Sequence, residues 1–396
     1  MMCRPTWPSA RGIPTPTLRL ICFFLLATGF AVPAEEGGGK RFEFFGDFRL
    51  RFEQDWDSLQ GDGTERDDRL RSRIRLRLGV DVRLDDDWSI LVQARTGRHS
   101  SQQSPHITIY DFDGGPTGHY QANLDHWFVK FESGGFDVWI GRNELSYLHQ
   151  DDLFIFDNVT YLGAGGSYRQ KLGPGALIWN LNYVNLPVGM RDISGTGLIG
   201  QLAYDRDFEN SGFTIAGGFF ATHADPDDPA GDILLTDNNT RDYRSLSLEF
   251  QYRGRLFGGP CRVGFDLSHN TENYDNAPPG SFSHFHKDDV NGYVVEFEWG
   301  SREEAGDWVL GYYHAYQEAL TAHSSYIQDD WVRWGNASQV RATNLDGNEF
   351  RVIYTIRPNM NIFARLFFVD AIDLLEPGDT TKETGNRFRV DYNVSF

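Results

Sequence analysis

Residues 68–84 read Asp-Arg-Leu-Arg-Ser-Arg-Ile-Arg-Leu-Arg-Leu-Gly-Val-Asp-Val-Arg-Leu. Apolar or small residues occupy every even position from Leu70 to Leu84, and the odd positions apart from Gly79 carry arginine or aspartate. A period of two places these sets on opposite faces of one long β-strand, whereas on a helix the arginines would surround the whole circumference. One face of this strand therefore suits hydrocarbon and the other suits water.

Two classes of protein use such a strand. A soluble sandwich could bury the leucines in its core, but the stretch is longer than the usual strand of about 5–6 residues. Its polar face is also almost purely cationic. A strand of a transmembrane barrel needs a lipid-facing apolar side and a lumen-facing polar side, so it meets both demands at once. The rest of the chain has to decide between the two classes.

The same alternation recurs along the chain, and the segments that show it are joined by long and short connections in turn. These segments are 42–52, 68–84, 88–95, 127–131, 136–140, 159–169, 177–183, 198–204, 213–219, 246–252, 261–267, 293–299, 308–316, 350–356, 362–368 and 388–396. Aromatic residues gather near their ends, as in the girdles of outer-membrane barrels. The pattern predicts an all-β fold, a transmembrane antiparallel barrel of about sixteen strands with long extracellular loops and short periplasmic turns. A large secreted β-protein is the alternative.

The beginning of the chain has the features of a signal peptide. Three arginines precede the apolar run Leu20–Val32, and Val32-Pro33-Ala34 offers small residues for cleavage. The apolar run is shorter than the roughly 20 residues of a membrane-spanning helix. We therefore expect a signal peptide at 1–34 and a barrel over 35–396. Beyond the signal only Cys261 remains, which excludes an internal disulfide framework. The net charge of −19 and the mean hydropathy of −0.46 suit a soluble exported protein as well as a barrel.

Several short blocks resemble the Gram-negative outer-membrane porins grouped near the alginate-export family. The blocks are Gly46–Arg51, Arg71–Leu78 and Ile140–Tyr147, and the terminal Phe396, after alternating Val390, Tyr392 and Val394, resembles the recognition signal for barrel assembly. The resemblance implies passive diffusion or export of small or polymeric, often acidic, solutes. Family members tend to continue the third block with a glycine and a basic residue, whereas this chain reads His-Gln-Asp-Asp-Leu-Phe at 149–154. The resemblance therefore favours a porin, with an exporter of an acidic polysaccharide as the alternative.

Arginines dominate the predicted lumen side of four strands, which lie next to one another because the last strand of a closed barrel pairs with the first. Guanidinium groups suit two-point contact with carboxylate or phosphate. We predict that an arginine-lined lumen passes small, anionic, hydrophilic solutes. The predicted lumen residues are Arg49, Arg51, Arg69, Arg71, Arg73, Arg75, Arg77, Arg95, Arg142, Arg387 and Arg389. The alternative is that these arginines pair with acids of the lumen, such as Glu43, Asp47, Asp81 and Asp391.

The connection Asn143–Asn158 holds four successive apolar residues at 153–156, which is unusual for a solvated loop. Folding into the barrel would hide them and would bring acidic side chains near the pore. We therefore predict a constriction loop with Glu144, Asp151, Asp152, Phe154 and Phe156 as its residues. The alternative is that the apolar run extends a strand.

Other signals are weaker. The sequence holds neither a Gly-x-Ser-x-Gly nor a His-Glu-x-x-His motif, so we predict no enzyme, no cofactor and no metal site. The glycine cluster 163–166 lacks the context of a dinucleotide site and is expected to let a strand pass a bulky group. The acidic stretch Asp225–Asp232 is expected to be a solvated face, with calcium binding as the alternative.

We expect the chain to be an integral protein of a Gram-negative outer membrane. The partners that we expect are outer-membrane lipids, the barrel-assembly machinery through Phe396, and small hydrophilic or acidic solutes. We expect no nucleic acid. A homotrimer is compatible with this size, and a non-conducting structural or adhesion barrel is a further alternative.

Overall fold

The structure is a computed structural model that describes residues 41–189, 191–224, 242–332 and 342–396. The predicted signal peptide at 1–34 and the acidic stretch 225–232 lie outside the described residues. Among the described residues, no helix has both the length and the apolar character that a membrane crossing requires.

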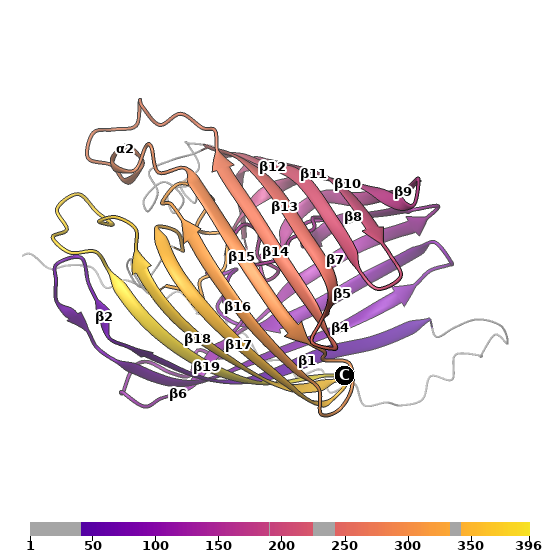
Figure 1. Ribbon diagram of the computed structural model, residues 1–396, viewed down its shortest axis with the longest axis horizontal. Helices are drawn as coiled ribbons and strands as arrows, with labels where there is room; N and C mark the ends of the chain where they lie inside the picture. The colour runs from indigo at the N-terminus through magenta and orange to yellow at the C-terminus, as the bar shows by residue number, and fades with distance from the viewer. Residues whose placement is uncertain (1–40, 190, 225–241, 333–341) are drawn as a thin grey trace, which may run out of the picture. The chain divides into compact units, whose positions relative to one another are not determined.

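Sixteen long strands form one closed antiparallel barrel in the described part of the chain, so the predicted fold class is confirmed (Figure 1). Each predicted segment coincides with one of them. The strands are β1 (Phe42–Trp56), β4 (Arg69–Arg83), β5 (Trp88–Thr96), β7 (Ala122–Ser133), β8 (Phe136–Asn143), β9 (Tyr161–Leu172), β10 (Gly175–Val188), β11 (Arg191–Asp207), β12 (Gly212–Ala224), β13 (Asp242–Leu256), β14 (Gly259–Asn270), β15 (Asn291–Gly300), β16 (Trp308–Gln317), β17 (Leu345–Arg357), β18 (Met360–Ala371) and β19 (Thr384–Ser395). The first strand pairs with the last, which closes the sheet. We call the end with short connections the turn end and the opposite end the loop end.

Within the described residues, four short elements lie in the long connections. They are β2 (Ser58–Leu59), β3 (Glu65–Arg66), β6 (Ile107–Asp111) and α2 (Phe282–Phe285). The strand β6 was not foreseen in the polar connection after β5. Its place has a physical reason, because β5 pairs only with the turn-end part of β4, from Arg77 to Arg83. The backbone groups of β4 nearer the loop end therefore need another partner, and β6 pairs with residues 71–74.

The alternation of the sequence separates the two faces of the barrel. On β1 and β4 the even, apolar side chains such as Phe52 and Leu78 point outward and are exposed, while the odd, charged side chains such as Arg51 and Arg75 are buried inside. Exposed aromatic side chains lie near both ends of the outer face. Trp88, Phe136 and Trp308 lie toward the turn end, and Tyr110, Tyr183 and Phe368 lie toward the loop end.

The glycine cluster of β9 makes room for a tryptophan, as the sequence predicted. Trp139 of β8 points inward and is almost fully buried. A Cβ atom added to Gly165 would lie 2.7 Å from the Trp139 ring, closer than real Cβ contacts, and it would also meet Asn182.

We therefore expect Gly165→Ala to lower the free energy of unfolding by about 1–3 kcal/mol, the usual cost of overpacking. The matched control is Gly217→Ala on β12, where the nearest atom to an added Cβ is the Ser247 carbonyl oxygen at 3.9 Å. The measurement is the temperature at which each refolded barrel loses its compact gel mobility. Equal temperatures for the two variants would contradict the expectation.

Candidate functional site

The inner faces of β19, β1 and β4 carry a wall of arginines with acids between them. We call Arg49, Arg51, Arg69, Arg71, Arg73, Arg75, Arg77, Arg387 and Arg389 the arginine wall. The strand register sets charges beside one another in rows: Arg389, Glu53 and Arg71 form one row. Arg387, Asp55 and Arg69 form the next row toward the loop end. Each β1 carboxylate in these rows therefore lies between two arginines, which favours ion pairs across the strands.

The distances between the charged groups confirm this pairing. Arg387 lies 2.5 Å from Asp55, and Arg389 lies 2.9 Å from Glu53. Of the four acids named as pairing partners, Asp47 and Asp391 do form ion pairs with the wall. Glu43 and Asp81 instead face each other across β1 and β4 near the turn end. Sequence reasoning missed Glu53 and Asp55, although both continue the alternation of β1.

One row of the wall has no carboxylate. Asn393, Arg49 and Arg75 lie side by side there, and the Arg49 Nε donates to the Asn393 side-chain oxygen at 2.6 Å. Arg75 shares Asp47 with Arg77. Positive charge therefore exceeds negative charge in this part of the wall.

The remaining two predicted lumen arginines hold loops. Arg95 of β5 donates to the carbonyl oxygens of Ser101 and Gln102 at 3.1 and 2.9 Å. Arg142 at the end of β8 donates to the Thr160 hydroxyl and carbonyl oxygens. Both side chains are buried and stabilise the loops beside them. Arg95 also lies next to Arg77 of the wall in the register of β4 and β5, and it contacts Asp125 at 3.3 Å.

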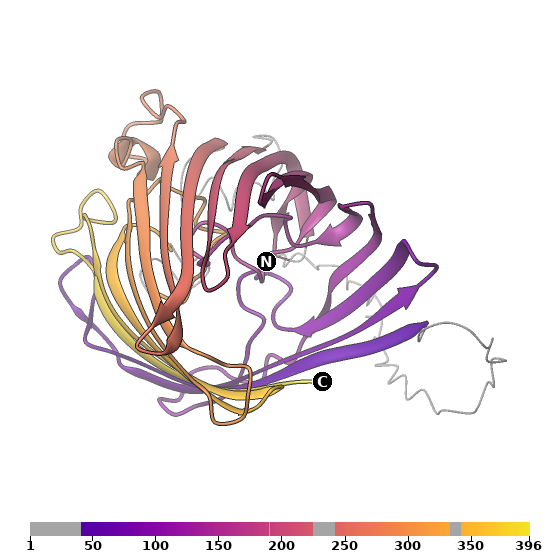
Figure 2. The ribbon, with the colours of Figure 1, turned by 45° about the vertical axis from the view of Figure 1, so that its right-hand side comes forward.

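The connection between β8 and β9, which we call the 144–160 loop, folds into the barrel. The Ser146 backbone N–H donates to Asn182 of β10 at 2.9 Å, and the Leu148 N–H donates to Gln201 of β11 at 2.9 Å. The Tyr147 hydroxyl bonds with Ser247 of β13. The loop therefore runs along the inner wall away from the strands that it joins. Figure 2 shows loop segments inside the barrel, between its opposite sides.

The five predicted residues of this loop take different places. Phe156 is buried, and Phe154 packs between the rings of Tyr147 and Phe220, each 6.3 Å away. Asp151 is buried and accepts the Leu153 N–H at 2.6 Å. Asp152 contacts a second loop, and Glu144 at the beginning of the loop is exposed.

A second inward segment, 318–332 after β16, was not predicted. Almost all of its residues are buried. Asp330 lies 2.8 Å from Arg365 of β18 and also contacts Arg389 and Arg51. Burial opposes ionisation of Asp330, but the charges of these three arginines outweigh it and hold the pKa of that carboxyl well below its usual range. The segment thus covers the part of the arginine wall nearer the loop end.

A third inward segment, 98–106 after β5, contacts the 318–332 segment. Gln102 donates to the Ser325 carbonyl at 3.0 Å, and Gln103 donates to the Ile327 carbonyl at 2.6 Å. The Ser104 hydroxyl accepts from Arg73 at 2.9 Å. The three segments narrow the lumen, and the wall side chains with the largest exposed fractions are Arg69, Arg77 and Arg49, at 30%, 26% and 20%.

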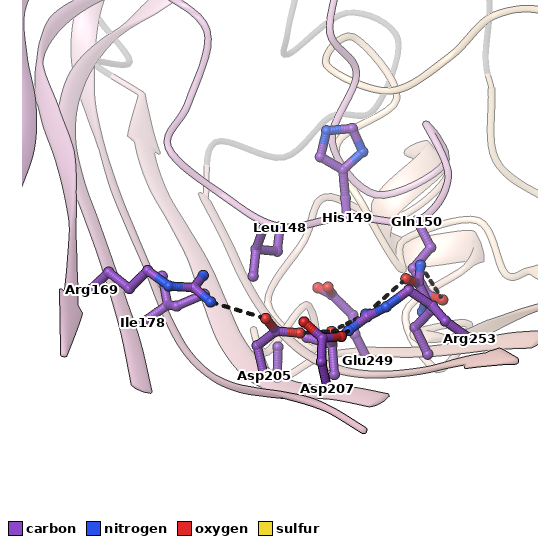
Figure 3. A pocket seen from close by; sticks show the side chains of 12 residues that line it. Leu148, His149, Gln150, Arg169, Ile178, Asp205, Asp207, Glu249 and Arg253 are labelled. Atoms are coloured by element: carbon purple, nitrogen blue, oxygen red, sulfur yellow. Dashed lines mark hydrogen bonds and ion pairs between the residues drawn. The ribbon is translucent and has the colours of Figure 1, made fainter. Parts of the chain in front are cut away.

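Open space remains inside the barrel below the 144–160 loop. A cavity of about 450 Å³ lies between Leu148–Gln150 and the inner faces of β9 to β13 (Figure 3). Near the turn end of this cavity, Asp205 forms ion pairs with Arg253 at 2.8 Å and with Arg169 at 3.1 Å. Charged groups therefore line this side of the lumen too.

The 318–332 segment holds a buried histidine, His323. The His323 ring stacks on Tyr326 with ring centres 4.4 Å apart, and it accepts the Ser325 N–H. Burial lowers the pKa of His323 from its ordinary 6.5 to about 3. Above pH 6.5 the imidazole is neutral in both the folded and the unfolded chain, so its burial costs no protonation energy. As the pH falls from 6.5 toward 3, the unfolded chain binds a proton that the buried ring does not, and the folded arrangement loses stability.

We therefore expect the segment to loosen in acid. Channel conductance in planar bilayers should be at least about twofold larger at pH 5 than at pH 7.5. His323→Phe keeps the ring stack without the titration and should flatten this profile. A parent that shows no change with pH, or a variant with the parent's profile, would contradict the expectation.

Comparisons with known proteins agree with this architecture. The family model of the "putative porin" family matches residues 62–193. No curated protein matches the sequence. Among solved structures, the chain is similar to OprB of Pseudomonas putida at high pH, with 12% identity, a TM-score of 0.56 and coverage of 90% of this chain and 94% of that one. It is also similar to OmpF of Salmonella typhi in complex with daunomycin, with 12% identity, a TM-score of 0.51 and coverage of 90% and 97%.

The outer-membrane-expressed OmpT of Vibrio cholerae is a third similar structure, with 11% identity, a TM-score of 0.50 and coverage of 91% and 99%. At these identities the structures bear on the fold. The resemblance to porins predicted from the sequence is thus confirmed, in the fold over most of the chain and in the family model over residues 62–193.

Proposed function

We propose that the protein is a water-filled channel in a Gram-negative outer membrane, through which small hydrophilic solutes diffuse passively and anions pass preferentially. The observation that carries the proposal is the polarity of the closed barrel, which is apolar outside and charged inside. A barrel of this strand number has room for an aqueous lumen. No bond needs to be made or broken, so the proposal assigns no catalytic turnover.

The outer face supports a membrane setting. Its exposed residues are apolar along the middle of the strands and aromatic toward both ends, as hydrocarbon and the lipid headgroup region require. Outer-membrane lipids are thus the proposed surroundings. We include recognition of Phe396 by the barrel-assembly machinery; the backbone of this residue pairs with Gly46 of β1, and its ring is exposed.

The preference for anions rests on the open part of the arginine wall. Arg49 lies in the row that lacks a carboxylate and Arg77 lies in the next row toward the turn end, and both are partly exposed on the inner face. Glu249, Asp266 and Glu296 lie on β13 to β15, elsewhere on the inner face. Charges act strongly in a narrow, poorly screened pore. The acids weaken the preference and give the lumen an electric field that orients dipolar solutes.

The test is electrical. Purified, folded protein in planar lipid bilayers should give stepwise increases in conductance. A folded barrel that inserts and remains silent would overturn the channel and would favour a structural or adhesion role. Release of fatty acid from the bilayer lipids would instead indicate a membrane-embedded hydrolase.

A further inference from the structure

Three side chains of the 144–160 loop converge on one point. The His149 Nε2 lies 2.9 Å from the Asp157 Oδ1. His149, Asp152 and Asp157 each offer one ligand atom, and these three atoms all lie within 4.8 Å of one another. We infer that these three residues form a binding site for a divalent transition-metal ion. One imidazole and two carboxylates are donors that Zn²⁺ accepts, and three protein ligands leave a position for water.

The histidine ring is oriented for this role. Its Nδ1 lies 2.9 Å from the Asp151 carbonyl oxygen. A carbonyl oxygen only accepts, so Nδ1 carries the hydrogen and Nε2 is the nitrogen that faces the two carboxylates. Histidines that bind metals commonly donate their other ring N–H to a carbonyl or carboxylate in this way, which fixes the ring and its tautomer.

The Asp152 carboxylate is oriented from another part of the chain. Gln328 of the 318–332 segment donates its Nε2 to the Asp152 Oδ2 at 2.8 Å. The Gln328 side-chain oxygen accepts from Arg365 at 3.2 Å, which determines which way the amide points. The second oxygen of Asp152 can therefore face the ion. A bound ion would fix the carboxylate through which the 144–160 loop contacts the 318–332 segment.

The third ligand distinguishes this site from ordinary histidine–carboxylate pairs. His223 and Asp242 are also 2.9 Å apart, but within the described residues no third group of metal-binding type joins them. His149 also lines the cavity of about 450 Å³, so a hydrated ion has a route to it. Figure 3 shows the His149 ring on the side of its backbone that faces away from the labelled side chains of the strands.

Binding is a ligand exchange. The ion gives up water molecules for the His149 nitrogen and the two carboxylate oxygens, and any proton on Nε2 passes to solvent. The ion brings positive charge into the narrowed lumen. The site itself does not depend on whether the barrel conducts.

The experiment measures binding directly. Full-length, refolded protein without a histidine tag is titrated with ZnCl₂ by calorimetry at pH 7.5. We expect the parent to bind one Zn²⁺ ion per chain, with His149 as a ligand. His149→Gln and Asp157→Asn should each lower the affinity for this ion at least about tenfold. The control His223→Gln removes the histidine of the exposed pair and should bind as the parent does.

Heat-dependent gel mobility checks that each variant is folded, and the nearly isosteric Asp157→Asn provides a second reading if His149→Gln does not fold. Absence of stoichiometric Zn²⁺ binding by the parent would overturn the site. Parent-like affinity in both loop variants would do the same. Calorimetry does not depend on conductance. A silent bilayer would therefore overturn only the channel proposal, and a failed titration would overturn only the metal site.

Discussion

Asp330→Ala should widen the channel and destabilise the barrel interior. Asp330 lies among Arg51, Arg365 and Arg389, all buried. Without the Asp330 carboxylate these guanidinium groups remain buried, and each keeps one carboxylate, Asp391, Glu349 or Glu53, in place of two. Removal of one partner from a buried ion pair typically costs about 3–5 kcal/mol. The cheapest relief is for the 318–332 segment to leave the arginine wall and let water reach it. We expect single-channel conductance to rise at least about twofold, together with a stronger preference for anions.

A matched control separates this effect from the loss of any ion pair. Asp275→Ala removes an exposed carboxylate that lies 2.9 Å from Lys287, and surface pairs contribute little. Its conductance and unfolding temperature should match those of the parent. If Asp330→Ala also conducts as the parent does, the 318–332 segment is not what narrows the lumen.

The double substitution Arg49→Gln and Arg77→Gln should reduce the preference for anions. Both side chains are partly exposed on the inner face, and the arginines of their part of the wall outnumber the acids. A unit charge about 4 Å away is worth about 1 kcal/mol even in bulk water, or about a fivefold change in occupancy. We expect the ratio of chloride to potassium permeability, taken from the reversal potential in a KCl gradient, to fall about fivefold.

The control changes the net charge by the same amount at the turn-end rim of the barrel. Arg83 and Arg255 are exposed at the turn end, and replacing both with glutamine should leave the reversal potential unchanged. A parent that prefers cations would refute the selectivity. Equal shifts in both double variants would mean that overall charge, and not the wall, sets it.

The strands could be predicted because their pattern is local. In a barrel with a polar lumen, every strand alternates between lipid and water, so a stretch such as 68–84 reports both of its faces directly. The inward course of the 144–160 loop also had a local signal, the apolar run 153–156. Sequence periodicity could not predict β6, because its cause is the shortness of the neighbouring β5.

The 318–332 segment had no such signal. It reads Glu-Ala-Leu-Thr-Ala-His-Ser-Ser-Tyr-Ile-Gln-Asp-Asp-Trp-Val, which shows no period of two. Its apolar Leu320, Ile327 and Trp331 hint at burial, but the partners of Asp330 come from β1, β18 and β19. Pairing between residues so far apart in sequence depends on the closed barrel. For the same reason the sequence, which predicted no metal site, could not identify the proposed metal ligands before the loop conformation was known.

The seam between β1 and β19 has a consequence for synthesis. The ladder joins Asp47 to Ser395 and Trp56 to Asn386, so it links the earliest and latest strands of the barrel. While the ribosome makes the strands between them, one edge of β1 has no partner, and an open edge readily pairs with other chains. Long-range pairing of this kind is also slow to form. Translation of β19 therefore sets the earliest moment at which this edge of β1 can gain its partner.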